Sequence, residues 1–184
     1  MVNRMANITL AVTGSISAYK AADLTSQLTK LGHKVTVLMS RSAMDFITPL
    51  TLQSLSKNLV HTDVMVEEDP SLIKHIDIAK ETDLFLVAPA SANTIAKLAH
   101  GMAENIVTAT ALALPIGIPK LIAPAMNTNM YLNPATQKNL NTLEEYGFDE
   151  VKPREALLAC GDFGTGALAE VTDILEKVSN TLDE

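Results

Sequence analysis

Four short apolar runs, interleaved with segments of helical periodicity, constrain the fold of this chain more than any other feature. The runs cover residues 7–13, 33–40, 83–90 and 118–126, and their length suits strands buried on both faces. Helical spacing of apolar residues occupies 16–32, 91–101, 105–114, 133–147 and 171–184. The alternation predicts an α/β fold with a single Rossmann-like open parallel sheet, doubly wound with helices on both faces.

Capping residues mark the ends of these helices. Ser91 and Gly101 bound one helix, and Asn133, Pro134 and Gly147 bound another. The first helix is expected to end before Gly32. Its apolar face is predicted to consist of Ala21, Leu24, Leu28 and Leu31.

Length and composition narrow the class of protein. A chain of 184 residues with 47% hydrophobic residues suits one domain over 1–184 with a sizeable core. The net charge of −7 argues against a nucleic-acid partner. A single cysteine excludes an intrachain disulfide, and neither a signal peptide nor a membrane-length apolar run is present. We therefore expect a cytoplasmic protein with no membrane or nucleic-acid partner.

Polar residues follow three of the predicted strands, at the edge where doubly wound sheets bind their ligands. They lie in TGSIS (13–17), APASANT (88–94) and APAMNTNM (123–130). Free N–H groups after Gly14, with the Ser15 and Ser17 hydroxyls, suit a phosphate group. The segment is neither G-x-G-x-x-G nor a P-loop, so neither a dinucleotide nor a nucleoside triphosphate is indicated.

A purely structural interpretation of these polar residues stays open. Serines in such places cap helices, and asparagines favour turns. In APASANT, however, Ser91, Asn93 and Thr94 offer three hydrogen-bonding side chains where one cap requires a single residue.

Two titratable residues stand outside those segments. His75 lies in SLIKHIDIAK (71–80), in the first turn of a predicted short helix, whose apolar face is expected to be Ile73, Ile76 and Ala79. Cys160 lies in the glycine-rich segment LLACGDFGTGALAE (157–170), either as a small buried residue or as a reactive thiol. No histidine pair has the spacing of helical metal ligands, so we expect no metal.

Six segments together resemble a known family. TGSISAYK, KHIDIA, PASANT, GMAENI, PAMNTNM and ACGDFGTG occur in this order, and they are similar to motifs of the homo-oligomeric flavin-containing cysteine decarboxylases. The resemblance runs from about residue 7 to the last helix. The ACGD segment resembles the corresponding segment of those family members that act on 4′-phosphopantothenoylcysteine in coenzyme A biosynthesis.

The resemblance implies FMN as cofactor and a homotrimer, or a multiple of trimers, with the flavin near the subunit interface. The residues that it assigns to FMN are Gly14, Ser15, Ile16, Ser40, Ser42, Ser91, Ala92, Asn93, Thr94 and Ala125. It assigns the substrate to Asn127, Met130, Ala159 and Cys160. His75, Asn127 and Cys160 are the implied catalytic residues, and about 153–170 is the implied flexible substrate clamp.

The implied reaction oxidises the substrate thiol, releases CO2 to give an ene-thiol, and reduces this to 4′-phosphopantetheine with the help of the flavin. His75 would act in the oxidative half, Asn127 would hold the carboxylate, and Cys160 would protonate the product. We expect the phosphopantothenate–cysteine ligase, fused to many bacterial relatives, on a separate polypeptide. Three positions depart from the common family pattern: Glu104 for Asp, Tyr131 for Trp, and Ala167-Leu168 for Arg-Met.

Three alternatives share the expected fold. A peptidyl-cysteine decarboxylase would stop at the ene-thiol, and the ACGD segment argues against it. A flavin prenyltransferase would need neither His75 nor the PAMN segment (residues 124–127). A non-catalytic regulatory flavoprotein would carry long acidic extensions, which this sequence lacks.

Overall fold

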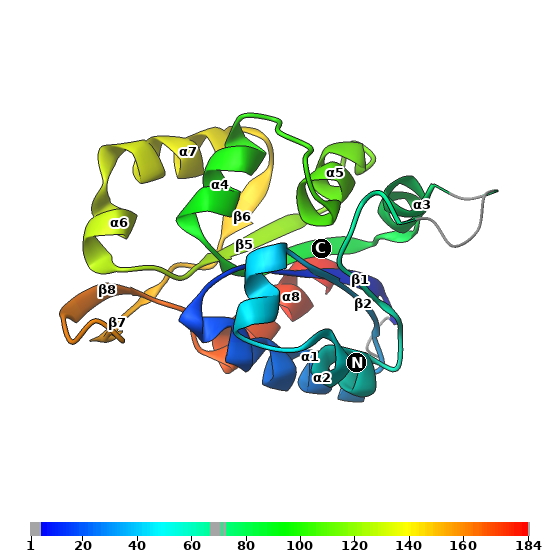
Figure 1. Cartoon of the computed structure of the whole chain (residues 1–184), viewed down its shortest axis with the longest axis horizontal. Helices are drawn as coiled ribbons and strands as arrows, with labels where there is room; N and C mark the ends of the chain where they lie inside the picture. The colour runs from blue at the N-terminus through cyan, green and yellow to red at the C-terminus, as the bar shows by residue number, and fades with distance from the viewer. Residues whose placement is uncertain (1–4, 67–70, 72, 184) are drawn as a thin grey trace.

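A parallel sheet forms the centre of the computed structural model, which describes residues 5–66, 71 and 73–183. Within these residues the sheet has six strands in the order β3-β2-β1-β4-β5-β6. The strands are β1 (Asn7–Val12), β2 (Lys34–Met39), β3 (Val60–His61), β4 (Leu84–Ala90), β5 (Lys120–Pro124) and β6 (Phe148–Glu150). The strand order reverses between β1 and β4, which places a topological switch point at their carboxyl ends (Figure 1).

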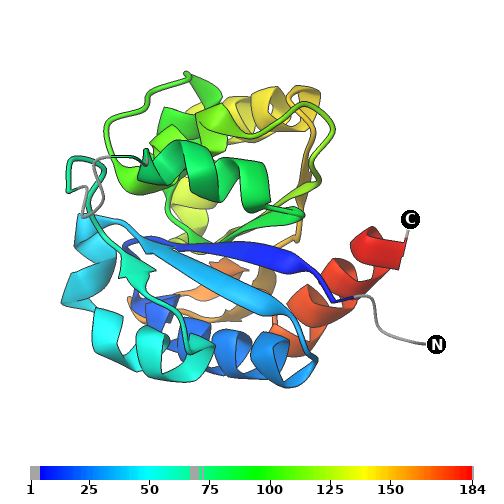
Figure 2. The same ribbon diagram turned by 90° about the vertical axis from the view of Figure 1, so that its right-hand side faces the viewer.

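Helices cover both faces of the sheet, as Figure 2 shows. One face packs against α1 (Lys20–Lys30), α2 (Pro49–Ser56) and α8 (Val171–Asp183). The other face packs against α3 (Lys74–Glu81), α4 (Ala92–Ala99), α5 (Ile106–Ala113) and α7 (Pro134–Glu145). Alternate residues of β1 enter the two cores: Ile8 and Leu10 the first, and Ala11 the second. The predicted doubly wound α/β fold is confirmed.

The predicted helix ends agree closely with the structure. Ser91 caps α4 and Asn133 caps α7, each by accepting a hydrogen bond from a backbone N–H of the first turn. Gly32, Gly101 and Gly147 have positive φ angles, as the residue that follows a helix often does. None of the helices that the structure describes is both long and apolar enough to span a membrane.

Two predicted apolar faces are partly wrong. Leu31 is 44% exposed because α1 ends one residue earlier, so its side chain has turned away from the core. Ile73 is 56% exposed because it precedes α3 rather than belonging to it, whereas Ala79 is buried as expected. Of the predicted segment 71–80, Leu72 lies outside the described residues.

Several elements carry no clear sequence signal and are not predicted. They are the helices η2 (Arg41–Asp45), α2 and α6 (Thr128–Leu132), the strands β3 and β6, and a hairpin of β7 (Arg154–Leu157) and β8 (Phe163–Ala167). The short helix η1 (Ile16–Tyr19), by contrast, forms the first turn of the predicted helix 16–32. The strands β3 and β6 have two and three residues, too few for a periodic pattern.

The hairpin forms most of the segment predicted as a substrate clamp. It is antiparallel and closed by a turn in which Leu158 N–H donates to the Asp162 carbonyl at 2.8 Å. The base of β8 lies directly on the PAMN segment, because Met126 N–H donates to the Gly166 carbonyl at 2.9 Å. A Cβ atom on Gly166 would overlap the Met126 carbonyl oxygen, so this close approach requires glycine.

Replacing Gly166 with alanine should therefore detach the hairpin from the PAMN segment. The φ angle of +151° and the overlap together should cost about 1–3 kcal/mol. Gly161→Ala is the matched control, because Gly161 also has a positive φ of +89° but has open space around it. Limited proteolysis should cut 154–167 faster in Gly166→Ala than in Gly161→Ala. Equal rates would contradict the close packing of β8.

Candidate active site

The buried side chain of Thr13 ties the carboxyl ends of β1 and β4 together. Its hydroxyl donates to the Pro89 carbonyl at 2.7 Å and accepts from the Ser91 backbone N–H at 2.9 Å. The turn after β1 and the start of α4 are thereby held side by side at the switch point, where ligands of such sheets bind.

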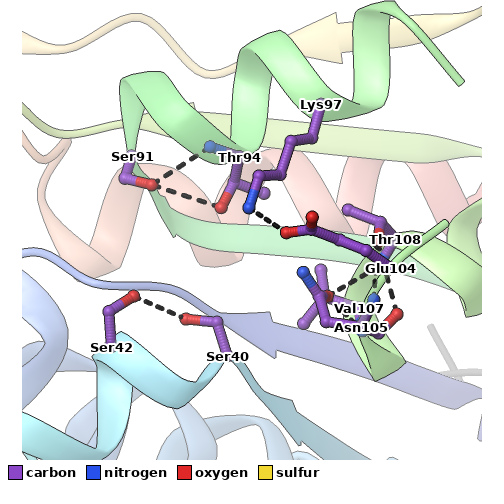
Figure 3. Close-up of polar contacts among 9 residues, drawn as sticks. All are labelled: Ser40, Ser42, Ser91, Thr94, Lys97, Glu104, Asn105, Val107 and Thr108. Carbon is purple, nitrogen blue, oxygen red and sulfur yellow. Dashed lines mark hydrogen bonds and ion pairs between the residues drawn. The ribbon is translucent and has the colours of Figure 1, made fainter. Parts of the chain in front are cut away.

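The turn at Gly14 passes against a pair of serines. A Cβ atom on Gly14 would overlap the Ser42 side chain, so glycine is required for this approach as well. The Ser40 and Ser42 hydroxyls are 3.2 Å apart, and Ser40 also caps η2 by accepting from Ala43 N–H at 3.3 Å. Figure 3 shows this pair at the same end of the sheet as Ser91 and Thr94.

The hydroxyls at the helix starts are used as caps, as the structural interpretation predicts. Ser15 caps η1 by accepting from Ser17 N–H at 3.3 Å. Ser91 accepts from Thr94 N–H at 3.2 Å and donates to the Thr94 hydroxyl at the same distance. Asn93 has no part in this cap and is exposed. Its side chain is thus available for a ligand.

Glu104, one of the departures from the family pattern, forms an ion pair with Lys97 of α4 (Figure 3). The next residue, Asn105, caps α5 in a reciprocal capping box with Thr108. The longer glutamate side chain therefore links the end of the α4–α5 loop to α4.

A cavity of about 500 Å³ opens beside the switch point, between the sheet edge and the β7–β8 hairpin. Many of the residues predicted to bind the cofactor and the substrate line it: Gly14, Ser15, Ile16, Ser91, Ala92, Ala125, Asn127, Met130, Ala159 and Cys160. These residues come from segments far apart in the sequence, and the fold brings them together around one cavity.

Asn127 and Cys160 are in direct contact in this cavity. The Asn127 side-chain amide donates to the Cys160 sulfur at 3.3 Å, and the thiol donates to an Asp162 carboxylate oxygen at 3.4 Å. Asn127 is held by its role as the cap of α6, in which its side-chain oxygen accepts from Asn129 N–H at 2.8 Å. The amide N–H groups therefore point toward the thiol. Cys160 is exposed, so it is not a core residue.

Five predicted site residues lie outside this cavity. Ser40, Ser42, Asn93 and Thr94 flank it at the sheet edge without lining it. His75 is further removed: it lies on α3, which packs against α5, and α3 and the β7–β8 hairpin lie at opposite ends of the view in Figure 1. The His75 Nδ1 atom is buried and has no hydrogen-bond partner in the described part of the chain.

Several further residues line the cavity without being among the predicted site residues, and Lys20, Phe46 and Arg154 are three of them. Lys20 stands inside the TGSISAYK segment, and its place in that motif is the signal that could have found it. Phe46 lies in a segment without such a signal, whereas Arg154 falls within the predicted substrate clamp of about 153–170. Among the described residues, no three His, Cys, Asp or Glu side chains gather as metal ligands would.

Tyr131 anchors the helix that carries Asn127 at its cap. Its hydroxyl donates to a Glu150 carboxylate oxygen at 2.9 Å, which links α6 to β6. Burial, together with the hydrogen bond and negative charge of Glu150, raises the pKa of Tyr131 to about 12. The phenol keeps its proton in the folded protein at pH values where the unfolded chain loses it.

This pKa predicts an alkaline loss of stability. Between the ordinary tyrosine pKa of 10.0 and the raised pKa of about 12, the unfolded state releases the Tyr131 proton while the folded state retains it. The free energy of unfolding should therefore fall as the pH rises through this range. Urea unfolding of the protein and of Tyr131→Phe, over a pH series, measures the difference between their free energies of unfolding at each pH. If the free energies of unfolding of the two proteins differ by a constant amount above pH 10, the raised pKa of Tyr131 is contradicted.

The residues around the cavity fit a flavin with a phosphate group. The backbone N–H groups of Gly14 and Ser15 have no hydrogen-bond acceptor among the described residues, and such groups bind phosphate. Ile16, Phe46 and Met130 are 57%, 47% and 49% exposed on the cavity wall, where they offer apolar surface to a flat ring.

Known proteins resemble this chain over almost its whole length. The Flavoprotein family model matches residues 2–183. A probable phosphopantothenoylcysteine decarboxylase of Streptococcus mutans is 60% identical over 95% of this chain and 98% of that protein. The coenzyme A biosynthesis bifunctional protein CoaBC of Bacillus subtilis is 46% identical over 92% of this chain, which spans 41% of that protein.

A solved structure is similar over its whole length. It is a cysteine-to-serine mutant of PPC decarboxylase complexed with pantothenoylaminoethenethiol, with a TM-score of 0.89 and 30% identity, and the match covers 98% of this chain and 100% of that chain. The chain therefore belongs to the Flavoprotein family, together with the phosphopantothenoylcysteine decarboxylases.

Proposed function

We propose that the protein catalyses the FMN-dependent decarboxylation of 4′-phosphopantothenoylcysteine to 4′-phosphopantetheine in coenzyme A biosynthesis. The observation that carries this proposal is the contact between the Asn127 amide and the Cys160 thiol inside one cavity. An uncharged donor for a carboxylate and an acid for the product carbon thus stand together. The names of its relatives, a probable phosphopantothenoylcysteine decarboxylase and a coenzyme A biosynthesis protein, support the same reaction.

FMN would be held at the carboxyl ends of β1 and β4. The N–H groups after Gly14 would bind its phosphate, with Ser42 and Asn93 close by, and Ile16 and Ala125 would border the ring. Bound FMN supplies the acceptor, and later the donor, of the electron pair that moves to and from the substrate. The purified protein should accordingly be yellow.

Asn127 would bind the substrate carboxylate through its side-chain N–H groups. A neutral amide holds the carboxylate without a cation that would stabilise it and oppose the loss of CO2. Because capping of α6 fixes the side-chain oxygen, the N–H groups keep their direction toward Cys160.

Cys160 would donate the proton that completes the product. A free thiol has a pKa of about 8.5, so it is mostly protonated near neutral pH. The Asp162 carboxylate accepts a hydrogen bond from the thiol and orients it. The hairpin that carries Cys160 would act as the clamp over the substrate, closing and opening about its glycines.

His75 would complete the site from a neighbouring subunit. It lies away from the cavity of its own chain, and its buried Nδ1 atom has no acceptor or donor beside it in the described residues. Large apolar side chains are exposed at the cavity, where Ile16 and Phe46 line it, and at the start of α3, where Ile73 precedes the helix. Such exposure is expected for a subunit interface. We propose a homotrimer in which His75 of one subunit acts on substrate bound in the next.

Mixing of two variants tests this arrangement. His75→Asn and Cys160→Ser should each fail to form 4′-phosphopantetheine. Trimers co-assembled from both variants should regain activity, because about a quarter of the sites would combine an intact His75 with an intact Cys160. The control is each variant re-assembled with itself. Absence of recovery in verified mixed trimers would place both residues in one subunit's site.

The main alternative is a peptidyl-cysteine decarboxylase, which would act on a peptide with a C-terminal cysteine. The two functions are separated by giving the FMN-loaded protein 4′-phosphopantothenoylcysteine and such a peptide in parallel. We expect CO2 release from the first substrate, with formation of the saturated thiol. Faster turnover of the peptide, ending at the ene-thiol, would favour the alternative.

A further inference from the structure

The regular pairing of β1 with β4 stops before the two strands reach the candidate site. The last paired residues are Ala11 and Val87, and the register of β4 with β5 shifts beyond Val87. Gly14 and Ser91 line the cavity from the two strand ends, and both lie past this point. The hydrogen bonds of the sheet ladder therefore do not fix the spacing between these two segments.

The side chain of Thr13 links the two segments beyond the end of the ladder. Its hydroxyl donates to the Pro89 carbonyl at 2.7 Å and accepts a hydrogen bond from the Ser91 backbone N–H at 2.9 Å. The Thr13 backbone N–H donates to the same Pro89 carbonyl at 3.3 Å. Thr13 is fully buried and is not part of the cavity lining. It therefore acts on the segments that line the cavity from behind, without facing the cavity itself.

This double contact requires a hydroxyl, because a hydroxyl donates and accepts hydrogen bonds at once and an alkyl side chain does neither. Gly14 follows Thr13 directly, and its backbone approaches Ser42 so closely that a Cβ atom would overlap the serine side chain. Ser91 begins α4 as its cap. A displacement at Thr13 would thus change the spacing between the Gly14 turn and the start of α4.

We propose that Thr13 is a positioning residue for FMN, an inference that rests on the proposed function. Its hydroxyl sets the spacing between the Gly14 turn and the start of α4, and this spacing determines how tightly the protein holds the flavin phosphate. A site whose groups are already held at the right spacing binds its ligand more tightly, because less ordering accompanies binding.

A second threonine of β1 provides a matched control. Thr9 is also buried, and its hydroxyl lies 2.7 Å from the Thr82 hydroxyl. It precedes Thr13 by an even number of residues, so both side chains are on one face of the strand, and it lies about 13 Å closer to the amino end of the sheet. Loss of the Thr9 hydroxyl should therefore lower the stability of the protein as loss of the Thr13 hydroxyl does, but leave the candidate site unchanged.

The test measures how fast FMN leaves the diluted holoenzyme, from the fluorescence of the released flavin. We expect roughly tenfold faster release from Thr13→Val, the order of effect of one lost buried hydrogen bond. Thr13→Ser keeps the hydroxyl, and it should release FMN at nearly the wild-type rate, as should Thr9→Val. A valine methyl would crowd the Pro89 carbonyl, so Thr13→Ala is a second variant, which removes the hydroxyl and adds no atom. It should match Thr13→Val.

The contrary outcomes separate positioning from a general loss of stability. Release at the wild-type rate from both Thr13→Val and Thr13→Ala would overturn the positioning role. Equally fast release from Thr9→Val would trace the effect to stability, and fast release from Thr13→Ser would trace it to the methyl group; either result overturns the proposal. Wild-type protein that binds no FMN would instead contradict the proposed function, because the assay needs no substrate.

Discussion

Replacing Cys160 with serine should stop the reaction after the loss of CO2. The serine hydroxyl is a far weaker acid than a thiol, so the ene-thiol should accumulate in place of 4′-phosphopantetheine, which has two more hydrogens. We expect formation of 4′-phosphopantetheine to fall by roughly a hundredfold or more, within the range for loss of a general acid. Mass spectrometry of the products under anaerobic conditions measures the ratio of the two thiols.

The stability of this variant separates a chemical role from a structural one. Cys160 is exposed, so Cys160→Ser removes no core contact and should leave the thermal midpoint nearly unchanged. Normal formation of 4′-phosphopantetheine by Cys160→Ser would show that another group is the acid.

Asn127→Asp should abolish turnover while leaving the fold intact. Aspartate is as good a helix cap as asparagine, so α6 should keep its hydrogen bond from Asn129 N–H. The substitution removes the amide donor and places a negative charge against the substrate carboxylate. We expect kcat/KM to fall by roughly a hundredfold or more.

The matched control for Asn127→Asp is Asn129→Asp. Asn129 is exposed two residues away, does not line the cavity, and undergoes the same change of charge. The Asn129→Asp variant should lose little activity. If both variants lose activity to a similar extent, the effect comes from the added charge on the surface and not from the carboxylate contact.

The sheet can be predicted from the sequence because the signals for its main strands and helix ends lie in short continuous segments. Each of β1, β2, β4 and β5 is a continuous apolar run, and the helix caps at Ser91 and Asn133 satisfy neighbouring N–H groups. Edge strands β3 and β6 have no such pattern, because their two and three residues pair on one side only.

The candidate site was only partly predictable, because its geometry depends on contacts between distant segments. The motifs identify Asn127 and Cys160 separately, but their contact depends on β8 lying on the PAMN segment, which Gly164 and Gly166 allow. Glu170, at the start of α8, forms ion pairs with Lys20 of α1 and with Arg154 of β7. No local sequence pattern predicts these contacts between distant segments. Nor does any motif show that His75 lies away from the cavity of its own chain.

The most direct test of the account is the fate of the substrate carboxylate. FMN-loaded protein should be incubated with 4′-phosphopantothenoylcysteine that carries an isotopic label in its cysteine carboxylate. The account predicts labelled CO2 and one equivalent of unlabelled 4′-phosphopantetheine, both lost in Asn127→Asp and retained in Asn129→Asp. Recovery of the substrate with its label intact, from protein shown to contain FMN, would contradict it.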